Sequence, residues 1–351
     1  MLNSDYNFGE RLVHQFALGS KFITKASFDF EEILCGSNII PTDGKHLFVS
    51  GLARSGTTVL MNSIHDSGKY NSLTYLDMPF VLMPNGWKKL AGLSSKSFEK
   101  SERAHGDGIL VGKDSPEAFE EVFWRVFCER DYIAKDQLSV HVVNDETIHL
   151  FRKFVNHVLL SRETGEQNRY LSKNNNNILR LSSIYKAFPS AFILATFRDP
   201  LQHAISLLNQ HKKFSLVHSE NKFSLKYMNW LGHFEFGLNH KPFYFGDDES
   251  FNRLKSYSTW DINYWLLIWK NYYSYLLDNH TPNVVFFCFE RYCSEPNEVL
   301  ARLYSIIDLD VVVCKPIEKF IPKRYNDSGV EKDILAECEE IYLRLVEKRL
   351  F

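Results

Sequence analysis

The sequence predicts an α/β fold with a central parallel sheet flanked by helices. Three short, continuously apolar segments are expected as strands buried on both faces: 47–50 (LFVS), 191–197 (AFILATF) and 283–289 (NVVFFCF). Each is followed by a segment whose apolar residues recur at helical spacing. This alternation of strand and helix is typical of a parallel sheet that helices cover on both sides.

The remaining elements follow from the same patterns. The helix after 47–50 should contain Met61 and Ile64 and end near Gly68, and RYLSK, at 169–173, should form another strand. A helix is expected to begin with Ser115 as N-cap and Pro116 as its first residue. Its buried stripe would be Phe119, Val122, Phe123, Val126 and Phe127. Later helices should carry Leu181, Ile184, Tyr185 and Phe188, and then Val299, Leu300, Leu303, Ile306 and Ile307.

These elements are expected to form a single domain over residues 1–351. The stretch at about 216–261 interrupts the alternation and mixes aromatic residues, His and Gly, so we expect an insertion or lid over the sheet edge.

Composition excludes several classes of function. The 351 residues include 41 Lys+Arg and 43 Asp+Glu, a formal charge of -2, which gives no basic footprint for nucleic acid or an anionic membrane. The six cysteines form no Cys-x-x-Cys pair and are expected as buried free thiols. The sequence shows neither a signal peptide nor an apolar run of 18 residues, so a cytoplasmic protein without membrane insertion is expected.

The segment GLARSGTTVL, at 51–60, is close to the phosphate-binding loop of nucleotide kinases and ATPases. Gly51, Gly56 and Thr58 have the required spacing, but Thr57 replaces the lysine that stabilises β- and γ-phosphates. Such a loop still presents backbone N–H groups and a helix N-terminus to an anion. Arg54 and the two threonine hydroxyls would suit the 5′-phosphate of a nucleoside monophosphate derivative better than ATP.

A second polar cluster lies in FRDPLQHAISLLNQ, at 197–210. Asp199 is expected as a helix N-cap and Pro200 as the first helical residue. Arg198 at the strand end and Ser206 two turns into the helix can converge on one anion, at the sheet edge where open α/β folds bind ligands. A capped helix whose Arg198 only pairs with a carboxylate is the alternative.

Together, GLARSGTTVL and the Arg and Ser of RDP-x5-S resemble the motifs of the PAPS-dependent sulfotransferases, over roughly 45–76 and 170–309. The resemblance implies a P-loop NTPase-like three-layer sandwich with helical and loop insertions, and PAPS as the sulfuryl donor. It assigns the 5′-phosphosulfate to the first loop: Arg54, Ser55, Gly56, Thr57 and Thr58. It assigns the 3′-phosphate, which distinguishes PAPS from other adenine nucleotides, to Arg198 and Ser206.

The resemblance also implies the catalytic groups. Lys173 would stabilise the bridging oxygen and the sulfuryl group, although Asn175 stands where the family usually has proline. A general base must accept the proton of the acceptor, and Asp77 is the first candidate, with His105 as the alternative. Glu117 and Glu120 are weaker candidates. The segment HFEFGLNHKPF carries three further polar residues, and we expect these to contact substrate: His233, Glu235 and His240. No metal is implied.

The sequence thus predicts transfer of a sulfuryl group from PAPS to an acceptor hydroxyl, releasing PAP. Aromatic residues make up 15% of the chain, and this content with the small net charge favours a glycan or glycan precursor as acceptor. Two other classes stay open, a nucleotide kinase-like P-loop enzyme and a non-catalytic nucleotide-binding protein on the same fold. Oligomeric state has no signal in the sequence.

Overall fold

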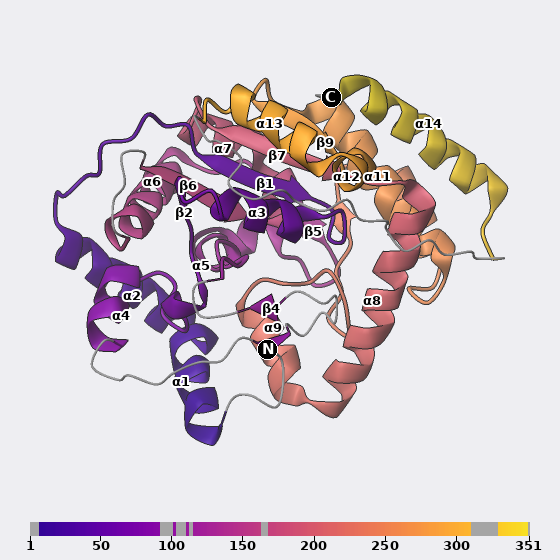
Figure 1. Ribbon diagram of the computed structural model, residues 1–351. Coiled ribbons are helices and arrows are strands. Elements are labelled where there is room, and N and C mark those ends of the chain that lie inside the picture. The colour runs from indigo at the N-terminus through magenta and orange to yellow at the C-terminus, as the bar shows by residue number, and fades with distance from the viewer. Residues whose placement is uncertain are drawn as a thin grey trace.

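The computed structural model describes residues 7–91, 115–162, 168–309 and 329–349, and the backbone of 101–102 and 110–111. In these residues the main sheet has five parallel strands in the order β2-β6-β1-β7-β9 (Figure 1). The strands are β1 (Leu47–Gly51), β2 (Tyr70–Asn71), β6 (Arg169–Lys173), β7 (Phe192–Phe197) and β9 (Val284–Cys288). Two small pairings lie outside this sheet: β3 (Ser101–Glu102) with β4 (Leu110–Val111), and β5 (Leu138–Ser139) with β8 (Phe243–Tyr244).

Helices make up most of the rest of the described chain. The first seven are α1 (Phe8–Gly19), α2 (Lys21–Cys35), α3 (Thr57–His65), α4 (Pro84–Ala91), α5 (Glu121–Tyr132), α6 (Asp145–Leu160) and α7 (Leu181–Ala187). The others are α8 (Pro200–Glu220), α9 (Lys222–Trp230), α10 (Asp248–Lys255), α11 (Ile262–Asn279), α12 (Phe289–Ser294), α13 (Pro296–Ile306) and α14 (Lys332–Lys348). Two short 3₁₀-helices are η1 (Tyr75–Asp77) and η2 (Asn175–Arg180).

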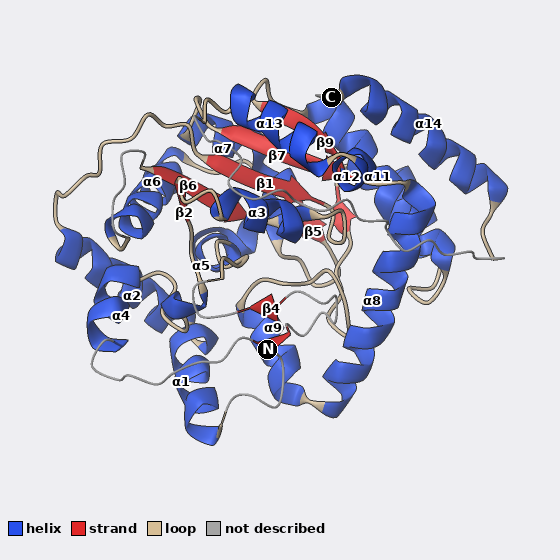
Figure 2. Cartoon of the chain, viewed as in Figure 1, coloured by secondary structure: helices blue, strands red, loops and turns tan. Residues whose placement is uncertain are grey.

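Each face of the sheet packs against its own set of helices. In β1, Leu47 and Val49 point to a core shared with α3, α12 and α13, whereas Phe48 points to the larger core with α5, α6, α7, α8 and α11. Alternate residues of a strand face opposite sides, so a strand buried on both must be apolar throughout. Figure 2 shows helices on both sides of the strands, and the predicted three-layer α/β architecture is confirmed.

The pairing register brings three strand ends to one edge. Val49 of β1 is opposite Lys173 of β6, and Gly51 is opposite Thr196 of β7. Because all of these strands are parallel, the segments that follow them leave the sheet on the same side. The glycine loop, Lys173 and the start of α8 are therefore neighbours.

One predicted helix start is wrong. Pro116 forms a β-bridge with Thr74, and the Glu117 N–H donates to the Leu73 carbonyl, 3.1 Å away, so the chain from Ser115 is extended. The helix α5 begins only at Glu121. The expected stripe is nevertheless inward-facing, as Phe119, Val122, Phe123 and Val126 are buried and Phe127 packs against them. A local cap signal was overridden by pairing with a distant segment.

The stretch predicted as an insertion or lid, 216–261, begins inside α8, which continues to Glu220. It then contains α9, an irregular segment, β8 and α10. The irregular segment at 231–241 lies against η2, because Asn175 and Asn176 both donate hydrogen bonds to it. Its role as a lid stays a prediction.

A fully buried ion pair fixes the chain after β6. Arg180 Nη1 lies 2.8 Å from Glu121 Oε2, and the guanidinium lies over the rings of Trp124 and Tyr132. The Asn174 side chain donates to the same Glu121 oxygen at 2.7 Å. Burial alone would raise the pKa of Glu121, but Arg180 and the hydrogen bonds lower it, so the carboxylate is ionised. Asn174, which precedes η2, and Arg180, its last residue, are thereby anchored to α5.

Replacing Arg180 by Met should destabilise the protein strongly, because Glu121 would be left as a buried charge without its cation. A loss of about 3–5 kcal/mol in the free energy of unfolding is expected from broken buried pairs. Urea unfolding measures it, with Lys186→Met as control, since Lys186 pairs with Asp145 at the surface. Equal midpoints for the two variants would show that the buried pair does not stabilise this region.

Candidate active site

The glycine loop between β1 and α3 is built for close backbone approach. Gly56 is the N-cap of α3 with φ +89°, and a Cβ there would lie 2.3 Å from Cδ2 of Phe289. A Cβ on Gly51 would lie 2.1 Å from Oγ1 of Thr196. Arg54 also has a positive φ, +74°, which is uncommon for a residue with a side chain. Gly56 has no side chain to cap the first-turn N–H groups of α3, so these donors suit an anion.

The remaining loop side chains divide into two kinds. Ser55 is fully buried, and its hydroxyl donates to the Leu52 carbonyl at 2.7 Å and meets Thr196 Oγ1 at 2.5 Å. Ser55 therefore fixes the loop to β7 and supports the loop conformation from its buried side. Arg54 is partly exposed, and Thr57 and Thr58 belong to the first turn of α3.

The second cluster is joined directly to this loop. Asp199 caps α8 as predicted, accepting from the Gln202 N–H at 2.9 Å with Pro200 in the first turn. Arg54 Nε donates to Ser206 Oγ at 3.4 Å, across 152 residues of sequence. One turn earlier, His203 Nε2 bonds the Ala53 carbonyl at 2.7 Å. Two bonds from α8 thus hold the loop, and the structure brings the predicted residues of both motifs together.

Burial lowers the pKa of His203 to about 3, with smaller contributions in the same direction from Arg198 and Arg54. The ring is therefore neutral, and its Nε2–H donates to Ala53. Both arginines disfavour the charged form of this imidazole. A neutral histidine adds no further charge beside them.

Arg198, at the end of β7, is held against α12. Its guanidinium carbon lies 5.1 Å from the ring centroid of Phe289, the residue that also packs against Gly56. Arg198 Nε is 4.0 Å from Glu290 Oε1, at the limit of an ion pair. The alternative considered for Arg198, pairing with a carboxylate, is thus present as a long contact with Glu290. The Phe289 ring links the loop and Arg198 into one packed unit.

Lys173 ends β6 on the other side of β1. The residue is only 8% exposed, and the next residue donates its backbone N–H to the Val49 carbonyl at 3.0 Å. Beyond it, Asn175 Nδ2 donates to Glu235 Oε1 at 2.9 Å and Asn176 Nδ2 to the Gly232 carbonyl at 3.2 Å. The asparagine run at 174–177, for which the sequence predicted no role, joins the end of β6 to the 231–241 segment.

A family model described as "Sulfotransferase family" matches residues 46–241, more than half of the chain. The chain belongs to the sulfotransferase family. The match includes the glycine loop, Lys173 and the start of α8. A comparison with curated proteins gave no match.

Three of the solved structures similar to this sulfotransferase are bacterial sulfotransferases. A sulfotransferase from Mycobacterium tuberculosis is 10% identical, with a TM-score of 0.44 over 85% of this chain and 76% of that one. One from Mycobacterium avium is 14% identical, with a TM-score of 0.45 over 99% and 80%. One from Alicyclobacillus acidocaldarius is 14% identical, with a TM-score of 0.42 over 87% and 93%.

The carboxylate of Asp77, the first candidate for the base of this sulfotransferase, is directed into its own turn. Oδ2 accepts from the Thr74 N–H at 2.7 Å and from Arg162 Nη2 at 2.5 Å, and the side chain is buried. This is a capping arrangement, and the role of Asp77 as a base stays a prediction. His105 lies outside the described residues.

The two weaker acidic candidates differ in surroundings. Glu120 is buried and accepts from Trp124 Nε1 at 3.1 Å and the Tyr170 hydroxyl at 3.2 Å. Burial raises its pKa. Glu117 is partly exposed and accepts from the Tyr75 hydroxyl at 2.9 Å. Glu120 is therefore a core residue, whereas Glu117 lies at the margin of the site.

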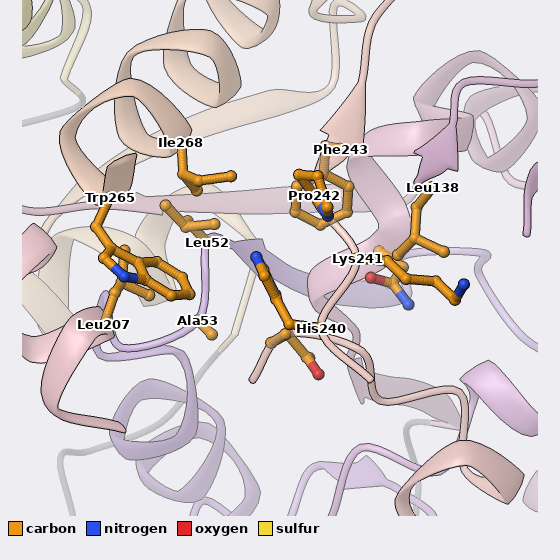
Figure 3. A pocket seen from close by; sticks show the side chains of 12 residues that line it. Leu52, Ala53, Leu138, Leu207, His240, Lys241, Pro242, Phe243, Trp265 and Ile268 are labelled. Atoms are coloured by element: carbon orange, nitrogen blue, oxygen red, sulfur yellow. The ribbon is translucent and has the colours of Figure 1, made fainter. Parts of the chain in front are cut away.

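A small cavity lies beside the glycine loop. Its walls come from the loop, α8, α11 and the 240–243 segment (Figure 3), and its volume of about 20 Å³ has room for about one water molecule. His240 lines this cavity, with Nδ1 3.1 Å from the Phe234 carbonyl and Nε2 2.8 Å from the Tyr264 hydroxyl. Burial lowers the pKa of His240 to about 3, so this histidine is neutral and bonded at both nitrogens.

Within the described parts of the chain, no group of three or more His, Cys, Asp or Glu could hold a metal ion. No helix in the same residues has the length and apolar content needed to cross a membrane.

Gly56→Ala should disrupt the loop more than the positive φ alone explains. Gly246 has nearly the same φ, +88°, but open space where a Cβ would be, so Gly246→Ala is the matched control. The control should lose roughly 1–2 kcal/mol of backbone energy. Gly56→Ala should lose clearly more, because its Cβ collides with Phe289. Thermal unfolding of the two variants compares them, and equal shifts would contradict the packing described for the loop.

Proposed function

We propose that this sulfotransferase moves the sulfuryl group of PAPS to an acceptor hydroxyl by in-line transfer and releases PAP. The observation that carries the proposal is the contact of Arg54 with Ser206, since it joins the loop and α8 at one sheet edge. A donor with a 5′-phosphosulfate and a 3′-phosphate needs two anion sites at a fixed separation. We assign these two sites to the glycine loop and to the start of α8, the segments that carry the two motifs.

For the donor, we assign the 5′-phosphosulfate to the loop and the first turn of α3. The contributing residues are Arg54, Ser55, Gly56, Thr57 and Thr58, with Ser55 acting through the shape of the loop. The 3′-phosphate is assigned to Arg198 and Ser206. Arginine suits this task because its planar fork binds phosphate oxygens bidentately.

Lys173 is assigned to the charge that develops during transfer. As the bond between sulfur and the bridging oxygen breaks, negative charge grows on the leaving phosphate, and a cation nearby lowers the barrier. The side chain is buried among fixed neighbours, so little reorganisation is needed when charge develops. The aromatic-rich chain and its small net charge favour a hydroxyl of a glycan or glycan precursor as the acceptor.

The donor assignment predicts tight binding of PAP and much weaker binding of AMP, since only PAP carries the 3′-phosphate. Arg198→Ala should abolish most of that preference and leave AMP binding nearly unchanged. Isothermal titration with PAP, AMP, ADP and ATP measures the affinity for each nucleotide, with the exposed Arg344→Ala as control. Equal binding of PAP and AMP, or tight binding only of ATP with Mg²⁺, would contradict PAPS and favour a kinase-like enzyme.

Lys173→Ala should lower the rate of PAPS turnover by about 10²–10³-fold, the range for loss of one group that stabilises developing charge. PAP affinity should change much less, because the effect belongs to the transition state. PAP release from PAPS and PAP titration separate the two quantities, with the exposed Lys186→Ala as control. Unchanged turnover would exclude Lys173 from the reaction and favour a non-catalytic lysine.

A further inference from the structure

A histidine and a carboxylate of the 231–241 segment form a pair in the segment that bonds the residues following Lys173. His233 Nδ1 lies 3.5 Å from Glu235 Oε1, and the two side chains are 17% and 11% exposed. With Nδ1 directed at the carboxylate, Nε2 is the ring nitrogen that remains for a substrate. A carboxylate that orients an imidazole in this way is a common arrangement around a proton-accepting histidine.

The position of the pair is set by the residues that follow Lys173. Asn175 donates to the same Glu235 oxygen that faces His233, and Asn176 donates to the carbonyl of Gly232, the residue before His233. The segment is thereby held over the end of β6. The charged groups that act on His233 are Glu235 from its own segment, Lys173 from β6 and Glu117 from the chain before α5.

Resting on the function proposed above, we propose that His233 is the general base of the sulfuryl transfer and that Glu235 is its positioning residue. His233 Nε2 takes the proton of the acceptor O–H while the oxygen forms its bond to sulfur. The bond from sulfur to the bridging oxygen breaks, and its electron pair stays on the 5′-phosphate of PAP. The proton leaves the imidazolium to solvent after the sulfated product departs.

The other residues considered for this step are occupied elsewhere. The Asp77 carboxylate is bonded to Arg162 and to its own turn. His240, in the same segment as His233, is bonded at both ring nitrogens. Of these three, His233 is the one whose ring feels the charge of Lys173, the cation assigned to the leaving group.

The surroundings of His233 also fix the direction of its pH dependence. Burial and Lys173 disfavour the charged ring, but the Glu235 carboxylate, helped by Glu117, outweighs them and raises the pKa of His233 above 6.5. Burial would raise the pKa of Glu235, yet His233 and Asn175 hold it at about 2. A base must be deprotonated, so kcat/KM should rise with pH through the His233 pKa. Removing the Glu235 charge should move that rise to lower pH.

The test measures PAP release from PAPS against pH, with water or N-acetylglucosamine as the hydroxyl source, beside PAP affinity by calorimetry. His233→Asn should lower kcat/KM by about 10²–10⁴-fold, the range of general base catalysis, and leave PAP affinity within about threefold. Added imidazole should restore part of the activity of His233→Ala. The exposed His149→Ala, on α6, is the matched control and should behave as the wild type at every pH.

The outcomes distinguish failure of the proposed base from failure of the proposed function. A wild type that binds no PAP or releases none from PAPS overturns the proposed function, and the base with it. If the wild type binds PAP but His233→Asn keeps its activity, the role of His233 as base is overturned alone. The same holds if His233→Ala loses activity and added imidazole restores none of it. Glu235→Gln should shift the acidic limb of the pH profile of kcat/KM to lower pH while the protein stays folded. An unshifted limb in that variant overturns the positioning role.

Discussion

The site depends on the parallel pairing of β1 with both β6 and β7. Val49 opposite Lys173 and Gly51 opposite Thr196 put the end of β1 between the two other functional strand ends. A shift of one residue in either register would turn the functional side chain at that strand end to the opposite face of the sheet. The apolar side chains on both faces prevent such shifts, so the packing of two hydrophobic cores sets the geometry of polar residues at their edge.

Placing Arg54 and Arg198 at one edge of the sheet costs free energy, because the two charges repel each other and lose contact with water. Neighbouring residues offset both effects. His203 joins α8 to the loop as a neutral ring, so it holds Ala53 without a third charge near Arg54 and Arg198. Phe289 offers an aromatic face to Arg198 and closes against Gly56. The loop can therefore stay in a conformation with positive φ at two positions, because the surrounding contacts determine it.

The sequence predicted what local patterns encode. Apolar runs predicted the buried strands, and Asp199-Pro200 predicted the start of a helix, because these signals lie in adjacent residues. The start of α5 was missed because Pro116 pairs with Thr74, about forty residues away, and no local rule includes that partner. The contact of Arg54 with Ser206 was not predicted, because the sequence motifs place Ser206 with Arg198 and Arg54 with the other anion site. The buried Glu121–Arg180 pair had no sequence signal at all, since either residue alone reads as part of a solvated helix.

The asparagine run shows how a departure from a family pattern can carry information. The resemblance places proline where this chain has Asn175, and proline has no side-chain donor to offer. Asn175 uses its amide to bond Glu235, which faces His233, while Asn176 bonds the backbone beside it. Asn174, in turn, is bonded to Glu121 in the core. Three consecutive side chains thus connect the core, the end of β6 and the segment above it. Replacing a rigid residue with hydrogen-bond donors trades local stiffness for long-range connection, and here that connection leads through Glu235 to His233, the proposed base.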